Sequence, residues 1–325
     1  MIKIAIIGFG TVGQGVAELL ARKREEIEKR IGKFKVVAIA DLTGSISGDF
    51  KLEDAIESRK QGKLPEQRSA MEVAEQEDYD VMIEVTTTRL DESGIVYMKT
   101  ALNKGASVIT SNKSIAIALP ELLKMAEKKN AKLLYEATVG GAMPVIKLLN
   151  SYLALCEIQR INGILNGTCN YILTRMEEEG LPYSQVLKEA QEMGIAESNP
   201  TADVEGIDAG IKLVILANTI GIPAKFEDVE REGITKITPH AFKVAMQKGF
   251  TIRLIAEASR RKLRVSPRLV KINSPLAIKG TLNALLINTD TAGEIFVAGR
   301  GAGKFETASA ILSDLYELFR SSGSR

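Results

Sequence analysis

Short apolar segments alternate with amphipathic ones over the first 135 residues. Runs rich in Ile, Val and Leu predict five strands, at residues 2–7, 35–40, 80–85, 106–110 and 131–135. Apolar positions at helical spacing predict helices at residues 11–31, 92–104 and 118–129. Residues 43–65 are expected to form a surface excursion with one short helix. Strands that alternate with helices are typical of a parallel, doubly wound α/β sheet.

The pattern changes after Glu136. Residues 144–152 are expected to be helical, and residues 155–165 to form an extended hairpin. Further helices are predicted at residues 168–178, 183–193, 203–220 and 307–319. Between residues 251 and 289, Ile, Leu and Val alternate with charged residues around Gly280, which is typical of antiparallel strands with turns. The second half is therefore predicted to be an α+β domain.

Two domains are expected from this change of pattern and from the length of 325 residues, at about 150 residues per domain. The first is predicted to span residues 1–136 and the second residues 137–299. The C-terminal helix, at residues 300–325, is expected to pack back on the first domain.

The amino-acid composition excludes several classes of protein and of site. Lys and Arg number 43 against 41 Asp and Glu, so no basic field for nucleic acid is implied. No apolar run reaches the roughly 18 residues of a membrane span, and the first residues do not resemble a signal peptide, so a cytoplasmic protein is expected. Two cysteines rule out a disulfide framework, and one histidine rules out a three-histidine metal site. Acid–base chemistry therefore falls to Lys, Asp, Glu or Tyr.

A glycine motif directly follows the first predicted strand. It reads Gly8-Phe9-Gly10-Thr11-Val12-Gly13 and opens a predicted helix. In the Rossmann fingerprint, the first glycine permits a tight turn, the second lets the backbone approach a pyrophosphate, and the third lets helix and strand pack closely. Because both sides of the motif match this context, residues 8–13 are predicted to bind a dinucleotide.

Asp41 ends the second predicted strand, where an acidic side chain can bind the adenosine ribose. That role would favour NAD over NADP, because the 2′-phosphate of NADP would meet the carboxylate. The alternative is a turn or helix-capping residue. Neighbouring basic side chains could reverse the preference, so the choice between NAD and NADP stays open.

Two lysines are candidates for proton transfer. Lys212 follows Asp208 by four residues on an apolar predicted helix, so both side chains project from one face. They form either a solvated surface ion pair or a functional pair, since a lysine on a buried helix needs a partner or a cleft. Lys113 follows the fourth predicted strand at the carboxyl edge of the sheet, where doubly wound folds bind ligands. Its alternative is a surface residue at a helix start.

One long block has a specific resemblance. Residues 166–173 read NGTCNYIL, residues 190–197 read AQEMGIAE, and residues 199–213 read NPTADVEGIDAGIKL. This block closely resembles homoserine dehydrogenase. Shorter segments agree in the same order: TSNK at 110–113, YEATVGG at 135–141 and GRGAG at 299–303. The resemblance covers essentially the whole chain and implies a short form without the C-terminal regulatory domain.

The sequence departs from the family pattern at three places. Cys169 stands where Thr is usual, Asn199 where Asp is usual, and Gly210 where Ala is usual. None of the three carries a chemical group used below.

The resemblance implies a role for each candidate residue. It makes Lys212 the proton donor, places Lys113 near the nicotinamide and the reacting oxygen, and makes Asp208 a substrate ligand. Glu197 is implied to bind substrate as well. Asp203 suits the same task, although it could simply cap the following helix. Gly194 and Gly301 are implied to lie beside the cofactor.

The resemblance also implies a monovalent cation, usually sodium. Its ligands would be the side chain of Glu136 and the carbonyl oxygens of Val139, Gly141 and Met143. A carboxylate beside a carbonyl-rich turn is a suitable hard-oxygen site for a small cation.

The implied activity is the NAD(P)-dependent interconversion of L-homoserine and L-aspartate 4-semialdehyde, in the biosynthesis of threonine, isoleucine and methionine. The implied assembly is a homodimer, paired through the strand-rich region 251–289. Two alternatives remain. One is a related Rossmann oxidoreductase that acts on another amino or hydroxy acid. The other is a non-catalytic NAD(H) sensor, which would need the glycine motif but not the lysines and carboxylates together.

Overall fold

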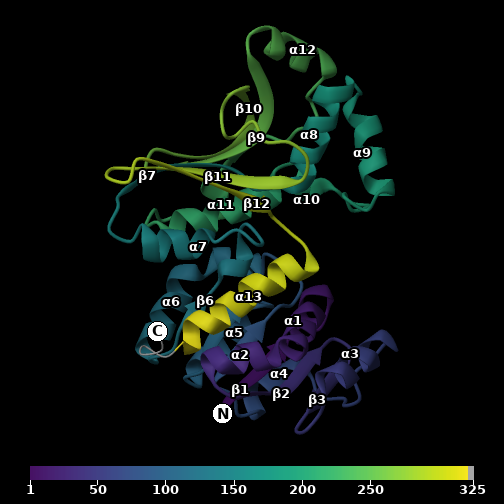
Figure 1. Cartoon of the computed structure of the whole chain (residues 1–325), viewed down its shortest axis with the longest axis vertical. Helices are drawn as coiled ribbons and strands as arrows, with labels where there is room; N and C mark the ends of the chain where they lie inside the picture. Colours follow the sequence, from purple (N-terminus) through teal and green to yellow (C-terminus); the bar gives the residue numbers. More distant parts are fainter. Residues whose placement is uncertain (321–325) are drawn as a thin grey trace. The chain divides into compact units, whose positions relative to one another are not determined.

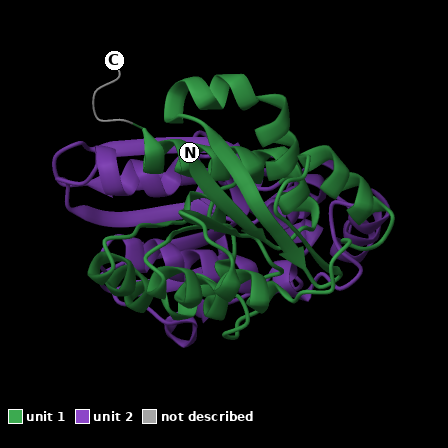
Figure 2. Ribbon diagram, turned by 90° about the horizontal axis from the view of Figure 1, so that it is seen from below, with its two compact units in different colours: residues 1–142, 303–325 green, residues 143–302 purple. Residues whose placement is uncertain are grey.

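The computed structural model describes residues 1–320. These residues form two compact units, drawn in two colours in Figure 2. Unit 1 comprises Met1–Ala142 and the segment that begins at Gly303, and unit 2 comprises Met143–Ala302. No helix among the described residues is long and apolar enough to cross a membrane.

Unit 1 is built on a six-stranded sheet in the order β3-β2-β1-β4-β5-β6. All neighbouring strands are parallel except β3, which runs antiparallel to β2. The strands are β1 (Ile2–Ile7), β2 (Phe34–Asp41), β3 (Gly44–Ser47), β4 (Val81–Glu84), β5 (Ser107–Thr110) and β6 (Leu133–Leu134). The doubly wound α/β fold expected for the first half is confirmed.

Helices of unit 1 connect and cover the strands (Figure 1). They are α1 (Thr11–Arg22), α2 (Arg24–Ile31), α3 (Leu52–Lys60), α4 (Ala70–Gln76), α5 (Ile95–Asn103), α6 (Leu119–Lys128) and α13 (Lys304–Phe319), with short 3₁₀ turns η1 (Lys113–Ile117) and η2 (Glu136–Thr138). Helix α13 lies along α1, and the first turn of α13 comes so close that a Cβ on Gly15 would lie 2.9 Å from Lys304. A glycine in α1 is therefore needed for this contact.

Unit 2 is built on a second six-stranded sheet in the order β12-β11-β7-β9-β10-β8. Its pairs are antiparallel, apart from the short parallel pair of β8 with β10. The strands are β7 (Ile158–Ile164), β8 (Glu230–Arg231), β9 (Phe250–Ser259), β10 (Lys262–Lys271), β11 (Leu282–Thr289) and β12 (Glu294–Arg300).

Along the chain, the helices of unit 2 come before β7, between β7 and β8, and between β8 and β9 (Figure 1). They are α7 (Val145–Lys147), the π-helical turn η3 (Leu148–Tyr152), α8 (Gly167–Glu179), α9 (Tyr183–Glu192), α10 (Thr201–Val204), α11 (Ile207–Thr219), the 3₁₀ turn η4 (Phe226–Asp228) and α12 (Pro239–Gln247). Helix α11 is buried along most of its length and packs against β9 and β10. The expected α+β character of this half is confirmed.

Several predicted elements need correction. The hairpin expected at residues 155–165 is wrong: that segment supplies only β7, whose partners β9 and β11 come about a hundred residues later in the chain. The helix expected at residues 203–220 is two helices, since Gly206 has a φ of +74°, a left-handed conformation that interrupts the helix. The helix expected at residues 11–31 is likewise broken at Lys23, where φ is −107° and ψ is 19°.

Other elements were not predicted. Strand β3 adds an edge to the first sheet within the segment expected to be a surface excursion. Strand β12 and helix α12 lie outside the segments assigned to strands and helices. Helix α4 is opened by a capping box, in which Ser69 and Glu72 bond to each other's backbone N–H groups.

Candidate functional site

The three glycines of residues 8–13 are needed for three different reasons. Gly8 has a φ of +99°, and a Cβ there would overlap the backbone of Val85 at 2.5 Å. A Cβ on Gly13 would lie 2.2 Å from the carbonyl oxygen of Gly8, so only glycine lets α1 pack on the turn. A Cβ on Gly10 would meet nothing within 4 Å. Gly10 therefore borders open space at the start of α1, where backbone N–H groups can bind a phosphate.

Asp41 lies at the end of β2, as predicted, and its side chain is largely buried. One oxygen, Oδ1, accepts from the backbone N–H of Thr43 at 2.7 Å and from its hydroxyl at 2.6 Å. The other, Oδ2, is paired with Nε of Arg59 at 2.7 Å. The carboxylate thus orders a turn and holds an arginine beside the end of the strand. Asp41 is therefore a turn-stabilising residue, and its binding of the adenosine ribose stays a prediction.

Glu84 ends β4 with a fully buried carboxylate. It accepts from Nδ2 of Asn112 at 3.2 Å, from the hydroxyl of Thr110 at 2.8 Å, and from both the hydroxyl and the backbone N–H of Thr86. Burial raises the pKa of the Glu84 carboxyl, and these hydrogen bonds oppose that shift. Each threonine hydroxyl also accepts a bond from Asn112, so both hydroxyl protons point to Glu84. The carboxyl group of Glu84 is therefore held in place by donors on Thr86, Thr110 and Asn112.

This buried network ends at Lys113. Asn112 is fully buried and caps η1 by accepting the backbone N–H of Ser114 at 2.9 Å. Lys113 is the first residue of η1, and its backbone N–H donates to the hydroxyl of Thr88 at 3.3 Å. Contacts with residues that follow β4 and β5 therefore fix the backbone of Lys113. It lies at the carboxyl edge of the sheet, as the sequence predicts.

Lys212 and Asp208 form a buried ion pair on α11. Nζ of Lys212 lies 2.7 Å from Oδ2 of Asp208, and the two side chains are 10% and 13% exposed. Nζ also donates to the carbonyl oxygen of Leu165 at 2.8 Å. A solvated surface pair is thereby ruled out. An ammonium has three N–H groups, and the described residues supply two acceptors, so one N–H remains for a ligand.

Asn166 connects two carboxylates, that of Asp203 on α10 and that of Asp208 on α11. Its Nδ2 donates to Oδ1 of Asp203 at 2.7 Å and to Oδ2 of Asp208 at 3.0 Å. Its Oδ1 accepts the backbone N–H of Cys169 at 2.8 Å, which caps α8. One asparagine thus begins α8 and fixes both carboxylates.

Two further carboxylates differ in environment. Burial raises the pKa of the Asp203 carboxyl, and repulsion from Asp208 and Glu197 adds to the shift, while Asn166 and Lys212 oppose it. The side chain of Glu197 is exposed on the loop before α10. The structure therefore brings together Asp203, Asp208 and Lys212. Glu197 is close enough for its charge to raise the pKa of Asp203.

The remaining predicted residues have structural roles of their own. Gly194 has a φ of +71° just after α9, and a Cβ there would meet nothing within 4 Å. A Cβ on Gly301 would lie 2.1 Å from the side-chain amide of Asn283. Glu136 is buried at the start of η2, its backbone N–H donates to Asp314 at 3.0 Å, and Gly140 and Gly141 follow with φ of +86° and +56°. The cation ligands Glu136, Val139, Gly141 and Met143 stay a prediction.

Sequence reasoning missed three of these participants. Asn166 begins the NGTCNYIL segment, and its position before a helix is a recognisable capping signal. Glu84 lies within a predicted strand, and nothing in its local pattern indicates a buried carboxylate. The carbonyl of Leu165 carries no sequence signal at all, because every residue has one.

Comparisons with known proteins agree over both units. The family model "Homoserine dehydrogenase, NAD binding domain" matches residues 8–136, and the model "Homoserine dehydrogenase" matches residues 144–316. A homoserine dehydrogenase of Methanocaldococcus jannaschii is 45% identical, with 98% of this chain and 98% of that protein covered. One of Neisseria gonorrhoeae is 35% identical, covering 98% of this chain and 72% of that protein.

Solved structures are similar over the same length. A protein from Archaeoglobus fulgidus assigned as a homoserine dehydrogenase is 63% identical, with a TM-score of 0.96 and coverage of 99% of this chain and 100% of that one. A hyperthermophilic archaeal homoserine dehydrogenase in complex with NADPH is 33% identical, with a TM-score of 0.86 and coverage of 98% and 97%.

Proposed function

The chain belongs to the homoserine dehydrogenase family, and from that premise we propose how its residues carry out the reaction. The family activity is an NAD(P)-dependent oxidation and reduction at a CH–OH group, between L-homoserine and L-aspartate 4-semialdehyde. The observation that carries the proposal is the buried pair of Lys212 and Asp208, in which one lysine N–H remains for a ligand.

Unit 1 provides the nucleotide site. The residues fit a dinucleotide, because Gly10 leaves open space at the N-terminus of α1 while Gly8 and Gly13 keep the turn tight. When bound, the nicotinamide supplies or accepts the hydride. The protein's part is to hold the pyrophosphate at residues 8–13 and to present the lysine at residue 113.

Lys212 moves the hydroxyl proton. In the oxidation of homoserine its amine accepts that proton from the substrate oxygen, and in the reduction of the semialdehyde its ammonium returns the proton to the same oxygen. Asp208 and the carbonyl of Leu165 hold two of the three N–H directions, which aims the third. Lys113 adds a second positive charge that stabilises the negative charge developing on the oxygen.

Carboxylates near Lys212 bind the substrate's ammonium group. Asp208, Asp203 and Glu197 are suited to this, since homoserine is a zwitterion and its ammonium requires acidic partners. The electrostatic coupling among these three groups supports a shared ligand, because a cation between them would relieve their repulsion.

Asp203→Asn separates substrate binding from folding. The folded-state pKa of Asp203 is raised, so the stability this group contributes is present below its unfolded pKa of about 4 and is lost as the pH rises through the folded value. The Asn variant should therefore melt at a higher temperature than wild type at pH 7, and the difference should shrink towards pH 4.

The KM for homoserine should rise by about 10–100-fold in the same variant, because the substrate loses one charge-assisted hydrogen bond. Thermal melts from pH 4 to pH 8 and steady-state kinetics measure both effects. A variant that is less stable at pH 7 and has an unchanged KM would return Asp203 to a purely structural role.

The pair of Asp41 and Arg59 sets the preference between NAD and NADP. We expect Arg59→Ala to weaken NADP(H) about 10-fold or more and NAD(H) much less, because only NADP(H) carries a 2′-phosphate on its adenosine ribose that the guanidinium can bind. Asp41→Ala should weaken NAD(H) more than NADP(H). Titration of all four nucleotides by fluorescence measures the affinities. Equal losses for both cofactors in both variants would leave the pair as a turn-ordering contact.

Three finer properties are proposed with the function. The protein is a homodimer through the region 251–289, supported by apolar side chains on the second sheet such as Leu269, which is 61% exposed; a monomeric mass in solution would contradict this. It binds a monovalent cation at Glu136, which replacement of sodium by choline during turnover would test. It acts in the cytoplasm, supported by two free cysteines; fractionated cell extracts would test this.

The activity itself is tested by homoserine-dependent reduction of NAD(P)⁺. Among the alternatives, a related oxidoreductase would prefer another hydroxy acid, and a sensor would bind nucleotide without turnover.

A further inference from the structure

The carbonyl oxygen of Leu165 accepts two hydrogen bonds. One comes from Nζ of Lys212 at 2.8 Å, and the other from Nδ2 of Asn283 at 3.0 Å. Leu165 lies between the end of β7 and the start of α8, and Asn283 is the second residue of β11. Both lone pairs of this carbonyl are therefore used, one for the lysine and one for an asparagine from a different strand.

Asn283 is enclosed on all sides. Its side chain is 1% exposed, and its Oδ1 has no hydrogen-bond partner among the described residues. Gly301 packs directly on the amide, since a Cβ there would lie 2.1 Å from it, and a Cβ on Gly167 would lie 3.5 Å from Oδ1. Within residues 1–320, the side-chain amide of Asn283 makes one hydrogen bond, to the carbonyl oxygen of Leu165.

A buried amide with an unpaired oxygen is unfavourable for folding, because the oxygen is desolvated without compensation. A position that served the core alone would be filled better by an apolar side chain of similar size. The remaining reason for an amide at this place is its donor, which holds the carbonyl to which Lys212 is bound.

We infer that Asn283 is a positioning residue for Lys212, and this rests on the proposed role of Lys212 as proton donor. Two acceptors orient the ammonium of Lys212: the carboxylate of Asp208 and the carbonyl oxygen of Leu165. Asn283 keeps the second of these in place by its own hydrogen bond to that carbonyl. Without Asn283 the carbonyl can turn, and the third N–H is no longer aimed at the substrate oxygen. Reactions of this kind lose rate steeply with misplacement of about 1 Å.

The test replaces Asn283 by leucine, which keeps the number of side-chain heavy atoms and removes the donor. We expect kcat to fall about 10–100-fold, while the dissociation constant for NADPH and the KM for homoserine change less than threefold. Asn283→Ala, which leaves space instead of apolar bulk, provides the same comparison if the leucine variant does not fold.

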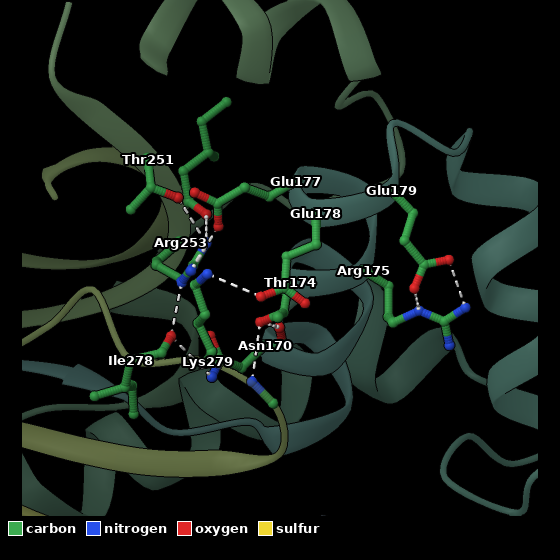
Figure 3. Close-up of polar contacts among 12 residues, drawn as sticks. Asn170, Thr174, Arg175, Glu177, Glu178, Glu179, Thr251, Arg253, Ile278 and Lys279 are labelled. Atoms are coloured by element: carbon green, nitrogen blue, oxygen red, sulfur yellow. Dashed lines mark hydrogen bonds and ion pairs between the residues drawn. The ribbon is translucent and has the colours of Figure 1, made fainter.

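Asn170 offers a matched control (Figure 3). It is also 1% exposed, its Oδ1 is also unpartnered among the described residues, and its Nδ2 donates to the carbonyl oxygens of Ile278 at 3.4 Å and Leu282 at 3.2 Å. Because Leu282 directly precedes Asn283, Asn170→Leu controls for a general loosening of β11. It should lower the melting temperature as much as Asn283→Leu and keep kcat within threefold of wild type.

A double variant gives a readout that a structural role would not produce. In a Lys212→Ala background, Asn283→Leu should lower kcat by less than twofold further, because Asn283 acts through the lysine. An additive loss, a wild-type kcat in Asn283→Leu, or an equal loss of kcat in Asn170→Leu would overturn the inference. If wild type shows no homoserine turnover, the proposed function itself fails. If only the Asn283 variants behave as wild type, this inference alone fails.

Discussion

We expect Lys212→Ala to lower kcat by about 10²–10⁴, the usual cost of losing a general acid–base group. The KM for homoserine should change less, since the proposed substrate contacts are made by Glu197, Asp203 and Asp208. Nucleotide affinity should stay as in wild type, because residues 8–13 and not Lys212 are expected to hold the pyrophosphate. Stopped-flow turnover and NADPH fluorescence titration measure these quantities.

Lys212→Arg is the sharper comparison. Removal of one partner from a buried ion pair costs about 3–5 kcal/mol, so the alanine variant also loses stability. Arginine keeps the positive charge beside Asp208 but does not release a proton near neutral pH. A proton-transferring Lys212 therefore requires a well-folded arginine variant that is inactive. Turnover of that variant near the wild-type rate would remove Lys212 from the chemistry and make Lys113 the next candidate.

Gly10→Val should abolish nucleotide binding and leave the fold intact. The backbone at Gly10 has a φ of −76°, which valine adopts without strain, and a Cβ there meets no protein atom within 4 Å. The added side chain enters the space assigned to the pyrophosphate. Binding of NADPH followed by fluorescence, together with a melting curve, checks both halves of the expectation.

Gly13→Val is the matched comparison on the same motif. A Cβ at Gly13 would lie 2.2 Å from the carbonyl oxygen of Gly8, so this variant should lose stability as well as binding. Normal NADPH affinity in Gly10→Val would show that residues 8–13 do not bind the pyrophosphate.

The first sheet was predictable because its central strands are buried on both faces. The segment IKIAII gives β1, in which residues 4–7 are buried, and such apolar runs between amphipathic helices have few other solutions. The second sheet was harder. Strand β7 pairs with β11, more than a hundred residues later, and no local pattern indicates a partner so distant.

In the candidate site, too, local features could be predicted and contacts between distant segments could not. The spacing of Asp208 and Lys212 on one helix predicted their pairing, because residues four apart share a helical face. The burial of the pair, and its contacts with the carbonyl of Leu165 and with Asn166, depend on packing between elements that are separate in the sequence. The buried carboxylate of Glu84 could not be predicted for the same reason, since two of its three donor residues, Thr110 and Asn112, lie about 26 residues later in the chain.

The most direct test of the proposed activity measures reduced nicotinamide by absorbance, with purified protein, L-homoserine and either NAD⁺ or NADP⁺. Wild type, Lys212→Arg and Gly10→Val are compared at equal folded concentration. We expect homoserine-dependent reduction by wild type alone, with NADPH still bound by Lys212→Arg and not by Gly10→Val. A folded wild-type protein that binds NADPH, yet neither oxidises homoserine nor reduces L-aspartate 4-semialdehyde, would contradict it.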